Sequence, residues 1–133
     1  MVRQCHMGDL DWMIDVARAC YPSFDEQSSC AWGVANLDNP RVKMVRGEMG
    51  FAIGAINSPF YQPNLIRGYQ VFLASLPRAG FEPVKLVRFL IRWAFDECGA
   101  VSFHFGEATG QNMKPIAKRV GAVADSESYT VTA

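Results

Sequence analysis

The chain lacks several features that would have pointed directly to a function. Its 133 residues contain only two histidines and four cysteines, and the cysteines (Cys5, Cys20, Cys30 and Cys98) form no CxxC pair. A zinc site is therefore not expected, and we interpret the thiols as reduced and mostly structural. Lys and Arg total 13, as do Asp and Glu, so no excess of charge favours nucleic acid or an acidic membrane surface.

Long apolar runs and repeats are also missing. No stretch reaches membrane-spanning length, and the N-terminal MVRQCHMGDLDW has no apolar core of the kind that secretion signals carry. We therefore expect a cytoplasmic protein with no bound metal. Half of the residues are hydrophobic, and residues 1–133 are expected to form one domain with a sizeable core.

The first third of the sequence predicts a short strand and two helices. The strand covers 2–6. Asp9 is a good N-cap for a helix whose apolar residues recur at helical spacing until Pro22 stops it. The second helix is expected to open with a capping box, S-x-x-E, formed by Ser23 and Glu26, and to reach about Leu37.

Three strands are predicted next, over 42–48, 50–57 and 68–76. The last two are separated by a loop whose tip carries Phe60 and Tyr61 between two prolines. The strand 68–76 has apolar residues on both faces, which is typical of a strand covered by helices on both sides.

The second half predicts a helix over 83–98, a strand over 101–105, a short helix ending at Gly121 and a last strand containing Tyr129 and Val131. The order β-α-α-β-β-β-α-β-α-β indicates an α/β fold with a mixed, mostly antiparallel sheet and helices on both faces. The strands before and after the 83–98 helix should be parallel. The loop between the first of them and that helix is then placed to bind an anion.

This order, together with the RAGFEP loop, Trp93-Ala94, Gly99-Ala100 and Gly121-Ala122, resembles the GNAT N-acyltransferase superfamily over essentially the whole chain. The resemblance implies that acetyl-CoA binds in a gap between the two parallel strands. Its pantetheine would pair with strand backbone, and its pyrophosphate would lie on backbone N–H groups at the helix N-terminus. The implied cofactor-binding residues are Leu73, Ala74, Ser75, Arg78, Ala79, Gly80 and Phe81.

The sequence departs from the family pattern in two places. Phe81 and Pro83 occupy the positions of the expected glycines, and Glu82 adds a negative charge beside the proposed phosphate seat. Ala117 falls where the family usually has the Tyr that protonates the departing thiolate, and Asn112 lies two positions away from the expected Asn. The degenerate motif predicts weak acetyl-CoA binding and an altered proton donor.

His104 and Glu107 are the candidate catalytic residues, because a His and a carboxylate at the gap could exchange a proton near neutral pH. The alternative is a His packed under a helix and a Glu that merely ends a strand. Glu48, at the end of an earlier strand, could also accept an amine proton or simply be exposed.

Lys85, Arg88 and Arg92 form a basic stripe on the 83–98 helix. It could meet the 3′-phosphate of CoA or an acidic partner. It could also be a solvated face in which Arg92 pairs with Asp96 at i,i+4.

Two functions remain open. The first is an acetyl-CoA-dependent N-acyltransferase acting on a small amine, a protein N-terminus or a Lys side chain. The second is a non-catalytic interaction protein with the same fold. RVGAV (119–123) also resembles the ending of small virion-associated proteins of T7-type short-tailed phages, which implies a protein assembly as partner and the virion as an alternative location.

Overall fold

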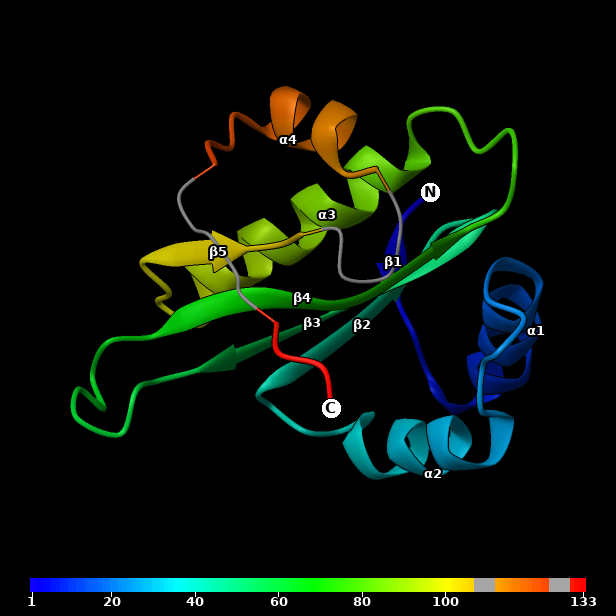
Figure 1. The fold of residues 1–133 in the computed structure, drawn as a ribbon, viewed down its shortest axis with the longest axis horizontal. Helices are drawn as coiled ribbons and strands as arrows, with labels where there is room; N and C mark the ends of the chain where they lie inside the picture. The colour runs from blue at the N-terminus through cyan, green and yellow to red at the C-terminus, as the bar shows by residue number, and fades with distance from the viewer. Residues whose placement is uncertain (107–111, 125–129) are drawn as a thin grey trace.

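The strands occur in the sheet in the same order as in the sequence. A computed structural model of the chain describes residues 1–106, 112–124 and 130–133 (Figure 1). In these residues the sheet has the order β1-β2-β3-β4-β5. The first three pairings are antiparallel and the last, β4 with β5, is parallel. The strands are β1 (Arg3–Gln4), β2 (Val42–Arg46), β3 (Gly50–Asn57), β4 (Arg67–Ser75) and β5 (Ser102–His104).

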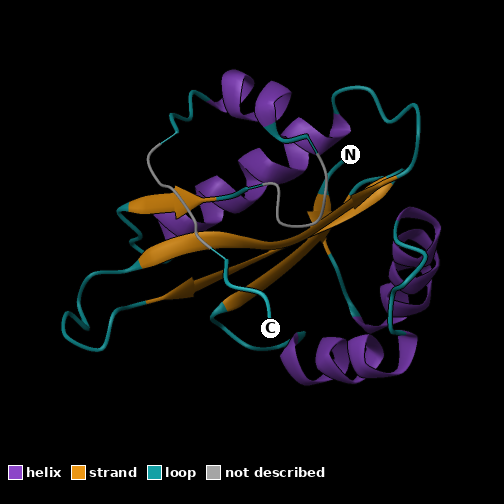
Figure 2. Ribbon diagram, in the orientation of Figure 1, coloured by secondary structure: helices purple, strands orange, loops and turns teal. Residues whose placement is uncertain are grey.

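Helices cover both faces of this sheet (Figure 2). A 3₁₀ turn, Met7–Asp9, leads into α1 (Leu10–Cys20), which is followed by α2 (Glu26–Asn36). On the other face lie α3 (Glu82–Arg92), which continues into a π turn (Trp93–Glu97), and α4 (Lys114–Val120). The crossover from β4 through α3 to β5 confirms the predicted parallel pair.

Strand β4 divides the core into two layers. Leu73 and Ala74 are 1% and 0% exposed, yet they belong to different apolar clusters, because neighbouring side chains of a strand point to opposite faces. Ala74 packs with α1 residues such as Met13, and Leu73 packs with α3 residues such as Leu90. The doubly apolar pattern of β4 therefore predicted its environment correctly.

Both predicted N-caps differ in detail. The Asp9 carboxylate makes no capping bond to α1. It accepts instead from the N–H of His6, an earlier residue, at 2.9 Å. The second helix begins at Glu26, and Asp25, not Ser23, caps it by accepting from the N–H of Ser28 at 3.0 Å. A cap must directly precede the first helical residue, so Ser23 is too far away.

The π turn at the end of α3 removes a predicted ion pair. A π turn closes its hydrogen bond over five residues, and here the N–H of Cys98 bonds to the carbonyl of Trp93. Side chains four residues apart then no longer align. Arg92 and Asp96, both in the described part of the chain, accordingly form no ion pair within 4 Å.

The end of the chain is only partly described. Residues 130–133 are not assigned to a strand, and Tyr129, which was expected in the last strand with Val131, lies outside the described residues. Within the described ranges, no helix combines the length and apolar character needed to cross a membrane.

Candidate functional site

The two parallel strands are paired along only part of β4. The register runs from Arg67 with Ser102 to Tyr69 with His104 and stops there. Strand β4 continues to Ser75 with β3 on its other edge. In the described residues, the edge of β4 that faces β5 is therefore without a strand partner from residue 70 onward, as the predicted gap requires.

A β-bulge lies at the start of this free edge. Phe72 pairs with Ile53 of β3 and Gln70 pairs with Gly54, so Val71 has no counterpart. A bulge bends its strand and increases the local twist. The bend therefore falls immediately after the last pairing with β5 and turns β4 as the two parallel strands separate.

Backbone carbonyls of β4 point into the gap and meet residues at the end of α1. The N–H of Leu76 bonds to Met49 on the β3 side, so by alternation Leu73 and Ser75 direct their backbone groups to the free edge. The hydroxyl of Tyr21 donates to the carbonyl of Leu73 at 2.8 Å, and the thiol of Cys20 lies 3.4 Å from the carbonyl of Ser75. Sequence reasoning missed Tyr21, which follows the helix stop and carries no motif.

The loop after β4 presents unpaired backbone donors. Arg78 has φ +69° and Gly80 has φ +62°, and a non-glycine residue in this region is uncommon and strained. The N–H groups of Arg78, Ala79, Gly80 and Phe81 donate no hydrogen bond within the described part of the chain. No side chain caps the N-terminus of α3, and open space lies in front of Gly80. Four donors without partners in the described residues, beside the positive end of a helix dipole, are an arrangement that can bind an anion; we call this loop the anion seat.

Glu82 does not face this seat, contrary to the sequence-based expectation. Its carboxylate accepts from the N–H groups of Glu48 and Met49, each at 2.9 Å, in the turn between β2 and β3. Any side chain at Gly47 would collide with that carboxylate. The negative charge is therefore fixed at a neighbouring turn by two charge-assisted hydrogen bonds.

A second cation lies near the loop. The guanidinium of Arg119, from α4, stacks on the ring of Phe81 at 4.5 Å from its centroid. Phe81 is exposed, and so is Arg78. The phenyl ring of Phe81 thus supports an arginine at the edge of the anion seat. Arg119 was missed because it lies 38 residues beyond Phe81 in the sequence, at the end of a helix with no recognised motif.

His104 lies where the two parallel strands separate. Phe103 packs into the cluster under α3 and α4, so His104 points to the opposite face, the one that carries α1 and α2. It is exposed, and its Nε2 is 2.9 Å from the hydroxyl of Ser102. The interpretation of a His packed under a helix is therefore wrong.

The remaining catalytic expectations have different outcomes. Glu107 lies outside the described residues. Ala117 is in α4, and its methyl group cannot donate a proton. The side chain of Asn112 accepts from the N–H of Lys114, the first residue of α4, at 3.1 Å, and Met113 precedes this helix without a side-chain cap. With seven residues, α4 is as short as the sequence indicated.

The basic stripe on α3 is exposed, but one of its three side chains already makes a hydrogen bond within the protein. Arg88 donates to the carbonyl of Arg119 at 3.0 Å and thereby holds α4 against α3. Lys85 and Arg92 remain on the surface. In the described residues, no three side chains of His, Cys, Asp or Glu come together as metal ligands would.

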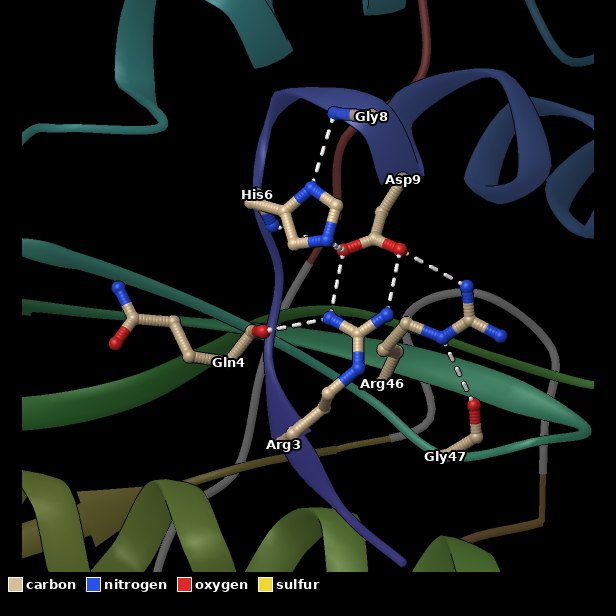
Figure 3. A network of polar contacts seen from close by, with 7 residues as sticks. All are labelled: Arg3, Gln4, His6, Gly8, Asp9, Arg46 and Gly47. Atoms are coloured by element: carbon tan, nitrogen blue, oxygen red, sulfur yellow. Dashed lines mark hydrogen bonds and ion pairs between the residues drawn. The ribbon is translucent and has the colours of Figure 1, made fainter.

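A second polar cluster is formed by the N-terminal residues and Arg46, and its polar groups bond to one another (Figure 3). The Asp9 carboxylate, 4% exposed as a residue, accepts two bonds from Arg3 at 2.8 Å and one from Arg46 at 3.0 Å. The Arg3 guanidinium is the main cause that holds the pKa of Asp9 well below its usual range, against the opposing effect of burial. Burial, with the Asp9 charge nearby, raises the pKa of Cys5 to about 12, so this thiol stays protonated.

Comparison by sequence finds no matching family model and no matching curated protein. Comparison of structures finds strong likeness. A candidate acetyltransferase from Agrobacterium tumefaciens str. C58 superposes with a TM-score of 0.82 at 16% identity, over 100% of this chain and 99% of that chain. An aminoglycoside antibiotic 6′-N-acetyltransferase from Acinetobacter haemolyticus has a TM-score of 0.77 at 13% identity, over 100% and 97%. A predicted acetyltransferase with acetyl-CoA, from Clostridium acetobutylicum, has a TM-score of 0.75 at 15% identity, over 99% and 95%.

These likenesses span nearly the whole length of both chains in each pair. The chain therefore has the GNAT acetyltransferase fold, in agreement with the order of its strands and helices. At such low identity the comparison concerns the fold, and the chemistry must be argued from this chain's own residues.

Proposed function

We propose that the protein is an acetyl-CoA-dependent N-acyltransferase. The proposal depends chiefly on one observation: the free edge of β4 leads directly to a loop whose N–H groups at residues 78–81 have no partner among the described residues, beside a helix that no side chain caps. Arg78, Gly80 and Phe81 are exposed, so these N–H groups are accessible to a ligand, and strained backbone such as that at Arg78 is concentrated at functional sites. The free edge suits an extended pantetheine, and the loop suits its pyrophosphate.

Positive charge supports the same assignment. Arg78 and Arg119 both lie at the loop, while the carboxylate of Glu82 is turned to the β2–β3 turn. A pyrophosphate would therefore meet two arginines and unpaired N–H groups, and Glu82, the carboxylate nearest in the sequence, is directed away from it. Charge-assisted bonds of this kind are among the stronger polar contacts in proteins.

The reaction is an acyl transfer. The lone pair of a neutral amine attacks the thioester carbonyl, a C–N bond forms, the C–S bond breaks, and the thiolate of CoA leaves with its electron pair. The amine nitrogen then loses a proton. His104, exposed at the point where the strands separate, is the described residue best placed to take that proton, directly or through water. Because Ala117 cannot donate, the thiolate takes its proton from water.

The test is calorimetry with acetyl-CoA, followed by mass-spectrometric detection of acylated amine. Colorimetric thiol detection is unsuitable because the protein has four free cysteines of its own. We expect measurable binding of acetyl-CoA, weaker binding of S-acetylpantetheine, which lacks the pyrophosphate, and slow transfer to at least one amine in a panel of small amines, protein N-termini and Lys peptides. Failure to bind acetyl-CoA at millimolar concentration would refute the proposal.

A non-catalytic role is the second candidate, favoured by the methyl group of Ala117 in the place of a proton donor. Its contact surface would be the β3–β4 loop tip, where Phe60 is 95% exposed and stacks edge-on against Tyr61 at 5.4 Å. Stoichiometric co-purification with a larger assembly, lost in Phe60→Ser, together with no acyl transfer to any amine, would favour this role.

A further inference from the structure

Helix α2 stands away from the sheet that it covers. Of its eleven residues only Gly33 is buried, and this glycine faces Leu10 of α1: a Cβ there would lie 3.3 Å from the Leu10 side chain. The helix is thus held by α1 rather than by the sheet. Beneath it remains a cavity of about 460 Å³, within the range of pockets that hold small molecules.

The walls of this cavity are apolar and rich in aromatic rings. Phe24, Trp32, Phe51 and Phe72 contribute rings from the α1–α2 segment, α2, β3 and β4. The polar groups that line it are the small side chains of Ser28, Ser29 and Cys30. No charged side chain is among the described residues that form its walls.

The cavity is lined on one side by β4, the strand along which acetyl-CoA is proposed to lie. Its wall includes Val71, the residue without a counterpart in the bulge, and Phe72, whose ring lies 5.1 Å from that of Tyr21. Tyr21 in turn reaches the carbonyl of Leu73 on the free edge. A molecule in the cavity would therefore extend toward the point where β4 and β5 separate.

We propose that this cavity holds the apolar part of the acceptor, which is an amine attached to an aromatic ring or a branched hydrocarbon. The inference rests on the proposed function and names its substrate class. A polycationic amine is a poor occupant, because no carboxylate in the walls can compensate a buried ammonium group. The same lack of charge favours the neutral form of the amine, since removal from water lowers the pKa of an ammonium group. The walls themselves would thus assist in producing the nucleophile.

Binding is tested first without acetyl-CoA. The protein is titrated with 2-phenylethanol, which carries the ring but no amine, and amide shifts are followed by NMR. We expect saturable shifts around Gly33, Val71 and Phe72, and none in the loop 78–81. Shifts that are absent, or that do not cluster at the cavity walls, would overturn the inference, whatever the outcome of acetyl-CoA calorimetry.

The acceptor class is tested next by transfer from acetyl-CoA to 2-phenylethylamine and to spermidine. Cys30→Phe fills the cavity, while Ala31→Phe adds the same ring at the adjacent, exposed position of α2 as a matched control. We expect transfer to 2-phenylethylamine at least tenfold more efficient than to spermidine, and a tenfold rise in KM for Cys30→Phe alone.

The outcomes separate the two proposals. A preference for spermidine, or equal KM changes in the two variants, would overturn the assignment of the acceptor and leave acyl transfer intact. Acetyl-CoA binding without transfer to any amine would refute the transferase itself and the acceptor assignment with it, and the 2-phenylethanol titration would then show whether the cavity binds apolar rings at all.

Discussion

Two polar regions of this molecule, the cluster around Asp9 and the loop 78–81, differ in how far their hydrogen-bonding groups are paired. At Asp9 both carboxylate oxygens accept two bonds each, from Arg3, Arg46 and the His6 backbone, and Arg46 also lies 3.5 Å from the centroid of the Trp12 ring. At the loop 78–81, four backbone donors lack partners within the described part of the chain and two residues have positive φ. The first region satisfies its own hydrogen-bonding groups, and the second leaves its donors available to water or to a ligand.

The difference distinguishes the Asp9 carboxylate, which stabilises the fold, from the N–H groups of the loop 78–81, which are available to a ligand. The Asp9 cluster joins β1, β2 and the start of α1, and it leaves no oxygen for a substrate. Unpaired, strained backbone at the N-terminus of α3 stabilises nothing by itself. Such features persist when the surrounding structure enforces them, and they are concentrated at functional sites. A perturbed pKa alone would have selected Asp9, and the hydrogen bonds show why that choice would be wrong.

The largest expected effect comes from breaking the closed cluster. Asp9→Asn leaves Arg3 and Arg46 without their common carboxylate, and loss of one partner from a buried charged group typically costs about 3 kcal/mol of unfolding free energy. Urea denaturation measures this loss. The control, Asp15→Asn, removes an exposed carboxylate 3.3 Å from Arg18 and should cost less than about 1 kcal/mol. Equal losses in the two variants would contradict the assignment of Asp9 as a fold-holding group.

The comparison of the native chain with Asp9→Asn should also depend on pH. Because the pKa of Asp9 is lower in the folded protein than in the unfolded chain, its contribution is fully present above the unfolded value, roughly 4, and is lost as the pH falls toward the folded value. The stability difference between the native chain and Asp9→Asn should therefore be constant from pH 7 to 5 and shrink below pH about 4. A difference that grows on acidification would refute the depressed pKa.

The open region should respond in ligand affinity rather than in stability. Arg78→Ala removes a guanidinium from the proposed phosphate seat and is expected to weaken acetyl-CoA binding about tenfold, or about 1.4 kcal/mol, with little change in unfolding free energy. Arg67→Ala is the control, since this exposed arginine lies at the far end of β4. An unchanged dissociation constant for Arg78→Ala would remove the loop from the site.

The fold was predictable because its signals are local and repeated. Alternation in β4 and helical spacing in α3 each extend over many residues, and the crossover between them defines the parallel pair. The caps were less predictable, because a cap depends on one local hydrogen bond. Asp25 makes that bond to α2, whereas the Asp9 carboxylate accepts from His6, Arg3 and Arg46 instead. The ion pair of Arg92 with Asp96 failed for a different reason: a π turn cannot be foreseen from a pattern that assumes 3.6 residues per turn.

The site was predictable only where one segment forms it. The loop 78–81 and the gap follow from the strand-to-helix connection, whereas Tyr21 and Arg119 reach the same place from remote parts of the chain. Glu82 shows the limit most clearly. Its position in the sequence puts it beside the phosphate seat, but its side chain bonds to a turn 33 residues earlier, which no local pattern reveals.

A smaller effect is expected from Glu82→Gln, which decides between these two views of its charge. If the carboxylate serves the β2–β3 turn, the variant should lose about 1 kcal/mol of stability, and its affinity for acetyl-CoA should change less than twofold. If the charge opposed the phosphates, the affinity would rise clearly. Calorimetry and urea denaturation measure both quantities, with Glu48→Gln, an exposed carboxylate of the same turn, as the control.

The smallest effect should come from Tyr21→Phe, and its sign matters. The hydroxyl of Tyr21 donates a hydrogen bond to the carbonyl of Leu73, and it would compete there with an amide N–H of the pantetheine. The variant keeps the ring against Phe72 and releases that carbonyl, so acetyl-CoA affinity should rise about threefold, equivalent to about 0.65 kcal/mol. The loss of stability should stay below about 1 kcal/mol, since the freed carbonyl lies on the open edge. Tyr69→Phe, earlier on β4, controls for the loss of a hydroxyl. A tenfold weaker affinity in Tyr21→Phe would show instead that the hydroxyl contacts the ligand itself.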